Sequence, residues 1–316
     1  MIASPSAEDI VDYASFDFAS LWPGRDKVTT VERSILREAF AGSDSRRILE
    51  IGTGFGRLLP VLTEVGTEVV ATDLDAERLA EVSLPVDEGR LRRVAANLYH
   101  LPFVDAAFTG ATMVRVYHHL LAPERALAEL SRVLRSGSTA VVSYQPRPSV
   151  GTLVGDVQRA LRRSGGRRMP PVTFARGSVI LDVDPFPIRA AERGQFASEV
   201  LGSGLDWIRD IGAGFEEYSV LRRFPARLFV RGGTVLGRAP AFPTRFAILS
   251  KQGTSQGFLP PVSEILACPR CRTPHPEWFA SAAPECRSCG FEGTHAGDLL
   301  DLRYIPRGTP QRRAVD

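Results

Sequence analysis

Between residues 46 and 144, short apolar runs alternate with segments whose apolar residues recur at helical spacing. The apolar runs are 47–51, 68–72, 91–95, 109–116 and 139–142, and the helical segments are 57–65, 76–82 and 123–134. Strands that alternate with helices form βαβ units, in which each helix carries the chain back so that the strands run parallel. The pattern therefore predicts an α/β fold with a doubly wound parallel sheet.

A glycine-rich loop, Glu50-Ile51-Gly52-Thr53-Gly54-Phe55-Gly56, follows the first of these runs. Glycines allow a sharp turn and let a ligand approach the main chain where a Cβ would collide. A dinucleotide site would place its third glycine at position 57, which is Arg here, and an acid before the first glycine suits a pyrophosphate poorly. The loop favours a phosphate-free ligand that combines an adenosine, a cationic sulfonium and an amino acid. The alternative is a tight turn without a ligand.

Two polar side chains end the next two predicted strands. Asp73 lies about 20 residues beyond the first glycine, where a carboxylate can accept both hydroxyls of a ribose. Asn97 ends the third strand and could face the adenine. The loop and these two residues together predict a nucleoside site at the carboxyl edge of the sheet.

From Ile48 to Tyr144 the sequence resembles the class I S-adenosylmethionine-dependent methyltransferases, especially the group related to ubiquinone and menaquinone biosynthesis. The matching motifs are 48–57, 71–75, 101–103 with Phe108, 118–120 and 130–137, and the resemblance extends over about 22–251. It implies a Rossmann-like methyltransferase sheet, an enzyme, and S-adenosylmethionine as cofactor. The implied cofactor-binding residues are Glu50, Gly52, Thr53, Gly54 and Gly56 for the methionine moiety, Asp73 and Leu74 for the ribose, Asn97 and Leu98 for the adenine, and Arg115.

One residue departs from this family, which usually has Asp where this chain has Asn97. An amide oxygen can still accept a hydrogen bond from the exocyclic amine of adenine. We therefore expect the adenine contact to persist in a weaker form.

Candidate catalytic residues follow the fourth predicted strand, in the stretch Arg115-Val116-Tyr117-His118-His119. Methyl transfer depends mainly on holding the nucleophile near the sulfonium methyl while solvent is excluded. A histidine could deprotonate an oxygen or nitrogen nucleophile near neutral pH. We interpret His119 as a packing residue and keep His118 and Tyr117 as catalytic candidates. The Asn/Asp-Pro-Pro-Tyr/Phe signature of amide or adenine nitrogen methylation is missing from this position.

All four cysteines lie in two Cys-x-x-Cys pairs, Cys268 with Cys271 and Cys286 with Cys289. Four thiolates in such pairs suit a tetrahedral structural zinc ion, whereas a redox Cys-x-x-Cys normally stands alone. The surrounding sequence resembles the small zinc-ribbon activator subunit of methyltransferases that act on tRNA, rRNA and release factors. The resemblance lies in residues 264–271 and 297–302 and implies a zinc ribbon. Because residues 263–313 hold seven arginines and six acids, they form no obvious phosphate-binding surface, and we expect the ribbon to support the catalytic domain or to contact a protein partner.

The length of 316 residues is roughly twice the commonest domain size and favours more than one unit. We divide the chain into an N-terminal helical or lid segment (1–45), a methyltransferase domain (46–251) with an insert (145–177), a linker (252–262) and a zinc-ribbon module (263–316). Within these units we also expect helices at 30–40 and 195–211 and strands at 215–221 and 245–250. The aromatic residues of the N-terminal segment, Tyr13, Phe16 and Trp22, could form a cofactor lid or pack in the core.

Charge constrains the partners of the protein. The formal net charge of +3 is too small for a general nucleic-acid or membrane clamp, but residues 145–177 hold seven arginines and one acid. If RNA is the substrate, this insert must bind it and the affinity must fall with salt. Because no aromatic residue is interleaved among the insert's central arginines, we favour a small or medium-sized acceptor. The alternatives are methylation of RNA or of a translation protein, and a non-catalytic S-adenosylmethionine-binding scaffold.

The sequence has no long uninterrupted apolar run, no basic and apolar leader at its start, and no cysteine before residue 268. We therefore expect a cytoplasmic protein without a membrane anchor.

Overall fold

The computed structural model describes residues 10–12, 18–84, 89–147, 149, 178–183, 186–217, 221, 223–237, 239, 241–254, 258–306 and 311–313. The arginine-rich part of the predicted insert, and the aromatic residues Tyr13 and Phe16, lie outside these ranges. Within the described part of the chain, no helix combines the length and apolarity needed to cross a membrane.

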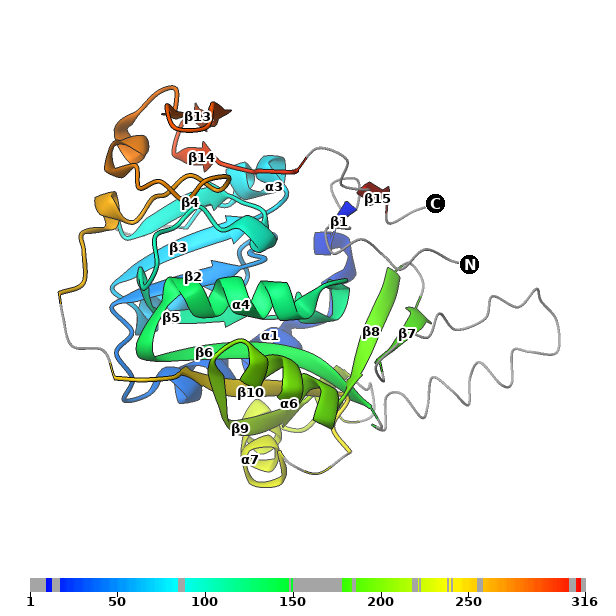
Figure 1. The fold of residues 1–316 in the computed structure, drawn as a ribbon. Helices are drawn as coiled ribbons and strands as arrows, with labels where there is room; N and C mark the ends of the chain where they lie inside the picture. Colours follow the sequence, from blue (N-terminus) through cyan, green and yellow to red (C-terminus); the bar gives the residue numbers. More distant parts are fainter. Residues whose placement is uncertain are drawn as a thin grey trace, which may run out of the picture.

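A central sheet organises the fold (Figure 1). Its core strands are β2 (Arg47–Ile51), β3 (Glu68–Asp73), β4 (Leu91–Ala95), β5 (Phe108–Met113) and β6 (Leu134–Arg147), arranged in the order β4-β3-β2-β5-β6. Each neighbouring pair in this order is parallel. The predicted doubly wound parallel sheet is confirmed.

Two further strands continue the sheet beyond β6. β10 (Thr244–Lys251) pairs antiparallel with β6, and β9 (Leu205–Ala213) pairs antiparallel with β10. A hairpin of β7 (Ser178–Val183) and β8 (Phe186–Glu192) joins β6 through β8.

Helices cover both faces of the sheet, and each face has its own apolar core. One core contains residues of α4 (Pro123–Val133) and α6 (Arg193–Gly202). The other contains residues of α1 (Asp26–Phe40), α2 (Leu59–Val65) and α3 (Ala76–Glu81), with α7 (Ala226–Leu236) packed against it. Because β2 and β5 lie between these layers, every residue of both strands is buried, including the polar side chains of Arg47 and Glu50 in β2.

The prediction of a helix over 195–211 is wrong in its second half. α6 ends at Gly202, and the chain re-enters the sheet as β9 from Leu205. Gly202 and Gly204 bracket the break, and Gly204 has φ +76°, a conformation that ends a helix readily. The predicted strand over 215–221 is also wrong, because Phe215–Glu217 forms a short 3₁₀ helix and 218–220 lie outside the described residues.

The C-terminal module is built into the same sheet. Its elements are the 3₁₀ helices Val262–Glu264 and Pro276–Ala280, β11 (Glu285–Cys286), β12 (Phe291–Glu292), β13 (Thr294–Ala296) and β14 (Leu299–Asp301). β14 pairs parallel with β4, and β13 pairs antiparallel with β14 (Figure 1). Residues of this module, including Leu266, Trp278 and Leu302, belong to the same apolar core as α4. Separately, β1 (Ile10–Asp12) pairs parallel with β15 (Gln311–Arg313).

Candidate functional site

A cavity of about 440 Å³ opens at the carboxyl ends of the parallel strands. Its lining comes from the segments that follow β2, β3, β4 and β5, together with Trp22 on one side and two residues of the C-terminal module on another. Ligands of doubly wound sheets bind at this edge. The cavity therefore lies where the sequence predicts a nucleoside site.

The loop after β2 takes backbone conformations that only glycine adopts freely. Gly52, Gly54 and Gly56 have φ values of +74°, +56° and +82°. The Gly52 N–H donates to the Thr72 carbonyl oxygen (2.8 Å), which ties the loop to the end of β3. A Cβ on Gly52 would lie 2.2 Å from Cγ2 of Val116. The glycine at position 52 is thus required both by its conformation and by the space available.

Two carboxyl groups flank this loop. The Gly54 N–H donates to Oδ2 of Asp73 (2.7 Å) and the Asp75 N–H donates to Oδ1 (3.0 Å). Glu50 is buried, and one of its oxygens accepts a hydrogen bond from the Thr53 hydroxyl (3.0 Å). Burial raises the pKa of Asp73, and it raises the pKa of Glu50 to about 8, although Thr53 and a nearby arginine oppose the shift. Both carboxyl groups are held in fixed positions beside the loop.

An ion-pair cluster closes the side of the cavity next to α1. Glu32 pairs with Arg57 and Arg115, and Arg115 also pairs with Glu217 (2.8 Å). Burial opposes ionisation of Glu32, but the two guanidinium groups still hold its pKa below its usual value. The ring of Trp22 lies over both arginines, 4.5 Å and 5.2 Å from their Cζ atoms. Trp22 therefore forms a wall of the cavity.

Arg115 combines this pairing with an unusual backbone. Its φ of +61° is uncommon for a residue with a side chain, and its N–H donates to the Ser143 hydroxyl (2.7 Å). Residues held in this way concentrate at functional sites. The strained turn sets the direction of the chain that follows β5.

The course of the chain after β5 determines which of residues 117–119 lines the cavity. His119 lines it, whereas His118 and Tyr117 are not among its lining residues. Tyr117 is fully buried, donates to Glu199, and packs its ring against Tyr144 and Phe196. Burial, together with nearby Arg115, lowers the pKa of His119 to about 4, so this imidazole is neutral at pH 7. The catalytic roles of His118 and Tyr117 stay predictions, and His119, which the sequence led us to interpret as a packing residue, is the one of the three that lines the cavity.

Asn97 contacts the C-terminal module. Its Oδ1 accepts from the Tyr99 N–H (3.0 Å), and its Nδ2 donates to the Tyr304 carbonyl oxygen (2.9 Å). Arg303 and Ile305, on either side of Tyr304, line the cavity. No sequence motif connects Arg303 and Ile305 to a site formed by residues 50–119, so their place at the cavity was not predicted.

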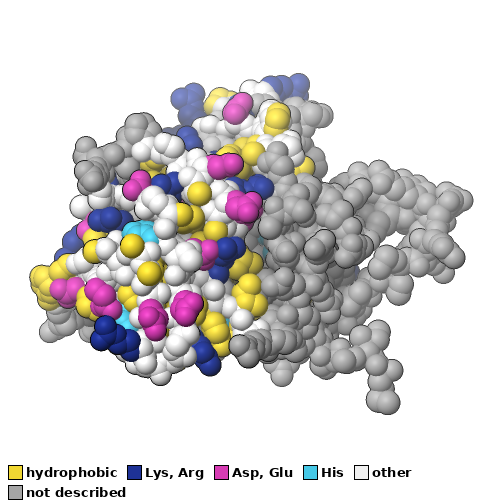
Figure 2. Space-filling model, turned by 90° about the horizontal axis from the view of Figure 1, so that it is seen from above, with side chains coloured by type: hydrophobic (Ala, Val, Ile, Leu, Met, Phe, Trp, Pro, Cys, Tyr) yellow, Lys and Arg dark blue, Asp and Glu magenta, His cyan; other side chains and the backbone are white. Residues whose placement is uncertain are grey.

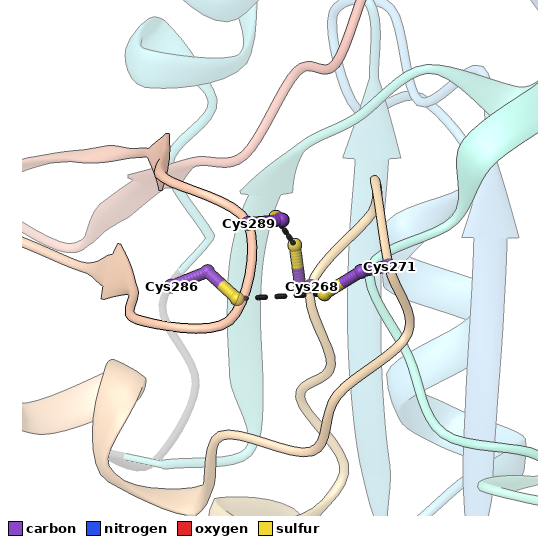
Figure 3. A group of neighbouring side chains, drawn as sticks. All are labelled: Cys268, Cys271, Cys286 and Cys289. Carbon is purple, nitrogen blue, oxygen red and sulfur yellow. Dashed lines mark hydrogen bonds between the residues drawn. The ribbon is translucent and has the colours of Figure 1, made fainter.

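The four cysteines converge in the module (Figure 3). Their sulfur atoms all lie within 4.8 Å of one another, with 3.5 Å between Cys268 and Cys289 and between Cys271 and Cys286. A tetrahedral ion with Zn–S bonds of about 2.3 Å requires sulfur–sulfur separations of about 3.8 Å. Hydrogen bonds from His275 and Cys271 lower the pKa of Cys286 to about 6 despite its burial, whereas burial raises the pKa values of Cys268 and Cys289. The separations of the sulfur atoms, rather than these shifts, fit a metal site.

Comparison with known proteins agrees with this geometry. Residues 49–142 match the family described as Methyltransferase domain. A demethylmenaquinone methyltransferase of Thermus thermophilus is 36% identical over 110 residues, which cover 34% of this chain and 50% of that protein. The O-methyltransferase rstn1 of Aspergillus nomiae is 24% identical over 141 residues, which cover 41% of this chain and 63% of that protein.

The chain spans about half the length of the first of these curated relatives. Among solved structures, a chain from the complex between the Haloferax volcanii Trm112 methyltransferase activator and a methyltransferase superposes with a TM-score of 0.49. The sequence identity is 15%, and the superposition covers 76% of this chain and 98% of that chain.

Proposed function

We propose, from the premise that residues 49–142 form a class I S-adenosylmethionine-dependent methyltransferase domain, that this chain transfers a methyl group from S-adenosylmethionine to an oxygen, nitrogen or carbon nucleophile of a small or medium-sized molecule. The observation that carries the proposal is the convergence of Glu50, the glycine loop and Asp73 on one cavity. Curated relatives named as demethylmenaquinone methyltransferases and O-methyltransferases support a small acceptor.

The residues around the cavity fit this cofactor. Glu50 offers a carboxylate to an ammonium group, and the glycine loop lets the methionine moiety approach the main chain. Each oxygen of Asp73 accepts one backbone N–H and keeps a lone pair for a ribose hydroxyl. Oδ1 of Asn97, which also accepts one bond, keeps a lone pair for the adenine amine.

When bound, S-adenosylmethionine supplies an electrophilic methyl group. The protein's part is to hold the acceptor in line with that methyl and to exclude water. His119 lines the cavity as a neutral imidazole, which places it beside the bound acceptor as the candidate to take up a proton from an acceptor hydroxyl or amine. We assign no covalent step to any other side chain.

We also propose that Cys268, Cys271, Cys286 and Cys289 hold one structural zinc ion. Four thiolates fill a tetrahedral shell and leave no position for water, which argues against a catalytic metal. The apolar core that the module shares with α4 supports a role in building the catalytic domain.

The surface charge of the described residues is mixed. On the face shown in Figure 2, acidic and basic side chains are interspersed.

Replacing Asp73 by Ala tests the cofactor assignment directly. The variant should bind S-adenosylmethionine about ten- to a hundredfold more weakly, because charge-assisted bonds to the ribose contribute roughly 1.5–3 kcal/mol. Isothermal calorimetry measures the change. Asp44→Ala is the matched control, since Asp44 pairs with Arg46 just before β2, at the opposite edge of the sheet. Equal affinities for Asp73→Ala and the wild type would refute the assignment.

The protonation of Glu50 predicts the pH dependence of binding. Because its pKa is raised to about 8, the carboxyl is mainly protonated at pH 7 in the free protein, whereas a bound ammonium group favours the ionised form. Binding should therefore release a proton, and affinity should rise by up to about tenfold per unit between about pH 5.5 and 7.5, where the ligand's amino group keeps its charge. Calorimetry in buffers of different ionisation enthalpy measures both effects.

Glu50→Gln is the control for this dependence, because it keeps the shape of the side chain and cannot titrate. It should bind more weakly and show a flatter pH profile. An affinity that falls with rising pH in the wild type would contradict the assigned role of Glu50.

The acceptor can be identified by mass spectrometry of metabolites and RNA from cells with and without the protein. A mass increase of one methyl group in a small molecule would support the proposal, and a change confined to RNA would make RNA the substrate. Cofactor binding without any methylated product would favour the scaffold alternative.

A further inference from the structure

The segment of the C-terminal module that follows β14 lies at the opening of the cofactor cavity. β14 runs parallel to β4 with Leu299 opposite Arg93 and Asp301 opposite Ala95, and the Leu302 N–H donates to the Ala95 carbonyl oxygen (2.9 Å). Parallel neighbours end at the same edge of a sheet. The residues after β14 therefore emerge where the cavity opens.

Arg303 is fixed across that opening. Its guanidinium group pairs side-on with the Asp301 carboxylate, at 2.9 Å from Nε to Oδ1 and 2.6 Å from Nη2 to Oδ2. Its Nη1 donates to the carbonyl oxygen of Leu74 (3.2 Å), the residue after Asp73. A planar cation thus spans the gap between the ends of β3 and β14 and lines the cavity.

The bond between Asn97 and Tyr304 explains the unusual residue at position 97. Asn97 is buried, and its amide donates to the Tyr304 carbonyl oxygen while accepting from the Tyr99 N–H, a combination that an ionised carboxylate cannot provide. An ionised Asp would place a carboxylate against a carbonyl oxygen with no proton between them. The residue that faces the adenine is therefore held by the C-terminal segment.

Tyr304 also links the segment after β14 to the cysteine cluster. Its ring packs edge-on against Phe291 (6.2 Å between centroids) and His100 (5.1 Å). Phe291 pairs with the zinc-ligand candidate Cys286 across β11 and β12.

We propose that residues 302–306 form the adenosine wall of the cofactor site, with Arg303 and Ile305 as ligand-contacting residues and Tyr304 as a positioning residue for Asn97. The inference rests on the proposed function. Arg303 presents a flat cation and Ile305 an apolar side chain, both of which suit the face or edge of an adenine. The cofactor site is then shared between the methyltransferase domain and the module, and its adenosine half is incomplete without the module.

Calorimetry with S-adenosylhomocysteine and with 5′-methylthioadenosine tests the wall, because the two ligands share an adenosine and only the first has an amino acid. Arg303→Gln and Ile305→Ser should each lower the affinity for both ligands by about the same factor, roughly fivefold to tenfold for the loss of one contact. Glu50→Gln should instead weaken only S-adenosylhomocysteine.

Arg46→Gln is the matched control for Arg303→Gln. Arg46 pairs side-on with Asp44, two residues earlier, as Arg303 does with Asp301, but it lies before β2 at the opposite edge of the sheet. The Arg46→Gln variant should bind both ligands with the affinity of the wild type. Because Arg303 is 38% exposed, its replacement leaves the core intact.

Asn97→Asp separates this inference from the family resemblance. The resemblance alone predicts equal or tighter adenosine binding, whereas the wall predicts about tenfold weaker binding near neutral pH and faster hydrogen exchange of the backbone amides of residues 302–305 without ligand. Unchanged affinity in Arg303→Gln and Ile305→Ser, or tighter binding in Asn97→Asp, would overturn the inference while the proposed function stands. A wild-type protein that binds neither ligand would overturn both.

Discussion

Gly52→Ala is expected to lower cofactor affinity by about a hundredfold or more and the free energy of unfolding by about 2–5 kcal/mol. The backbone at φ +74° disfavours an L-residue by about 1–2 kcal/mol. The new Cβ would also lie 2.2 Å from Cγ2 of Val116, and overpacking of this kind costs about 1–3 kcal/mol. Since β-branched side chains are stiff, the glycine loop or the chain after β5 must move, and both line the cavity.

Two further variants separate the backbone effect from the clash. Gly42→Ala has a similar φ of +78° but nothing within 4 Å of its Cβ, so it should lose only the backbone contribution and leave binding unchanged. Adding Val116→Ala to Gly52→Ala removes the clashing methyl and should restore part of the affinity. Calorimetry and denaturant unfolding measure the two effects, and wild-type binding by Gly52→Ala would show that the loop does not hold the ligand.

The cofactor half of the fold could be predicted because its signals are local. The glycine loop, the acid before it and Asp73 follow directly after buried strands, and a parallel sheet brings such strand ends to one edge. Local spacing also gave α2, α3 and α4, whose apolar residues recur at helical intervals. The structure brings Glu50, Gly52 and Asp73 to one cavity.

The pairing of β14 with β4 could not be predicted. Leu299-Leu300-Asp301 is too short to show a strand period, and its partner lies about two hundred residues earlier in the chain. Periodicity shows that a segment is buried but not which strand lies beside it. For the same reason the roles of Arg303 and Ile305 at the cavity depend on tertiary structure.

Which of the two histidines lines the cavity could not be predicted either. His118 and His119 are adjacent in a short 3₁₀ helix, so which of them meets the cavity depends on how the chain leaves β5. Arg115, with its positive φ, sets that exit, and no residue-type preference anticipates it. The pattern of residue types indicates which segment lies at the cavity, but the backbone conformation of the turn determines which histidine in that segment lines it.

Cys286→Ser should abolish zinc binding and unfold the C-terminal module. Structural zinc contributes about 10–16 kcal/mol to small domains, as much as the whole stability of a typical domain. Cys286 and Cys268 are buried in the same apolar core as Leu300 and Leu302, so loss of the metal should loosen the packing that holds β14. Elemental analysis should find one zinc ion per wild-type chain and none in the variant.

Amide hydrogen exchange of β4, at the edge of the parallel strands, shows whether the module stays folded without zinc. If the module unfolds, β4 loses its partner β14, so backbone amides of Leu91–Ala95 that pair on that side should exchange faster, whereas β2, between two parallel neighbours, should stay protected. Cys271→His is the matched control, because Cys271 is exposed and histidine is itself a zinc ligand, so this variant should keep the metal and the protection of β4. Zinc-free wild-type protein prepared without chelator, or a disulfide within either cysteine pair that survives in a reducing buffer, would contradict the assignment. Retained protection of β4 in metal-free Cys286→Ser would show instead that apolar packing alone holds the module on the sheet.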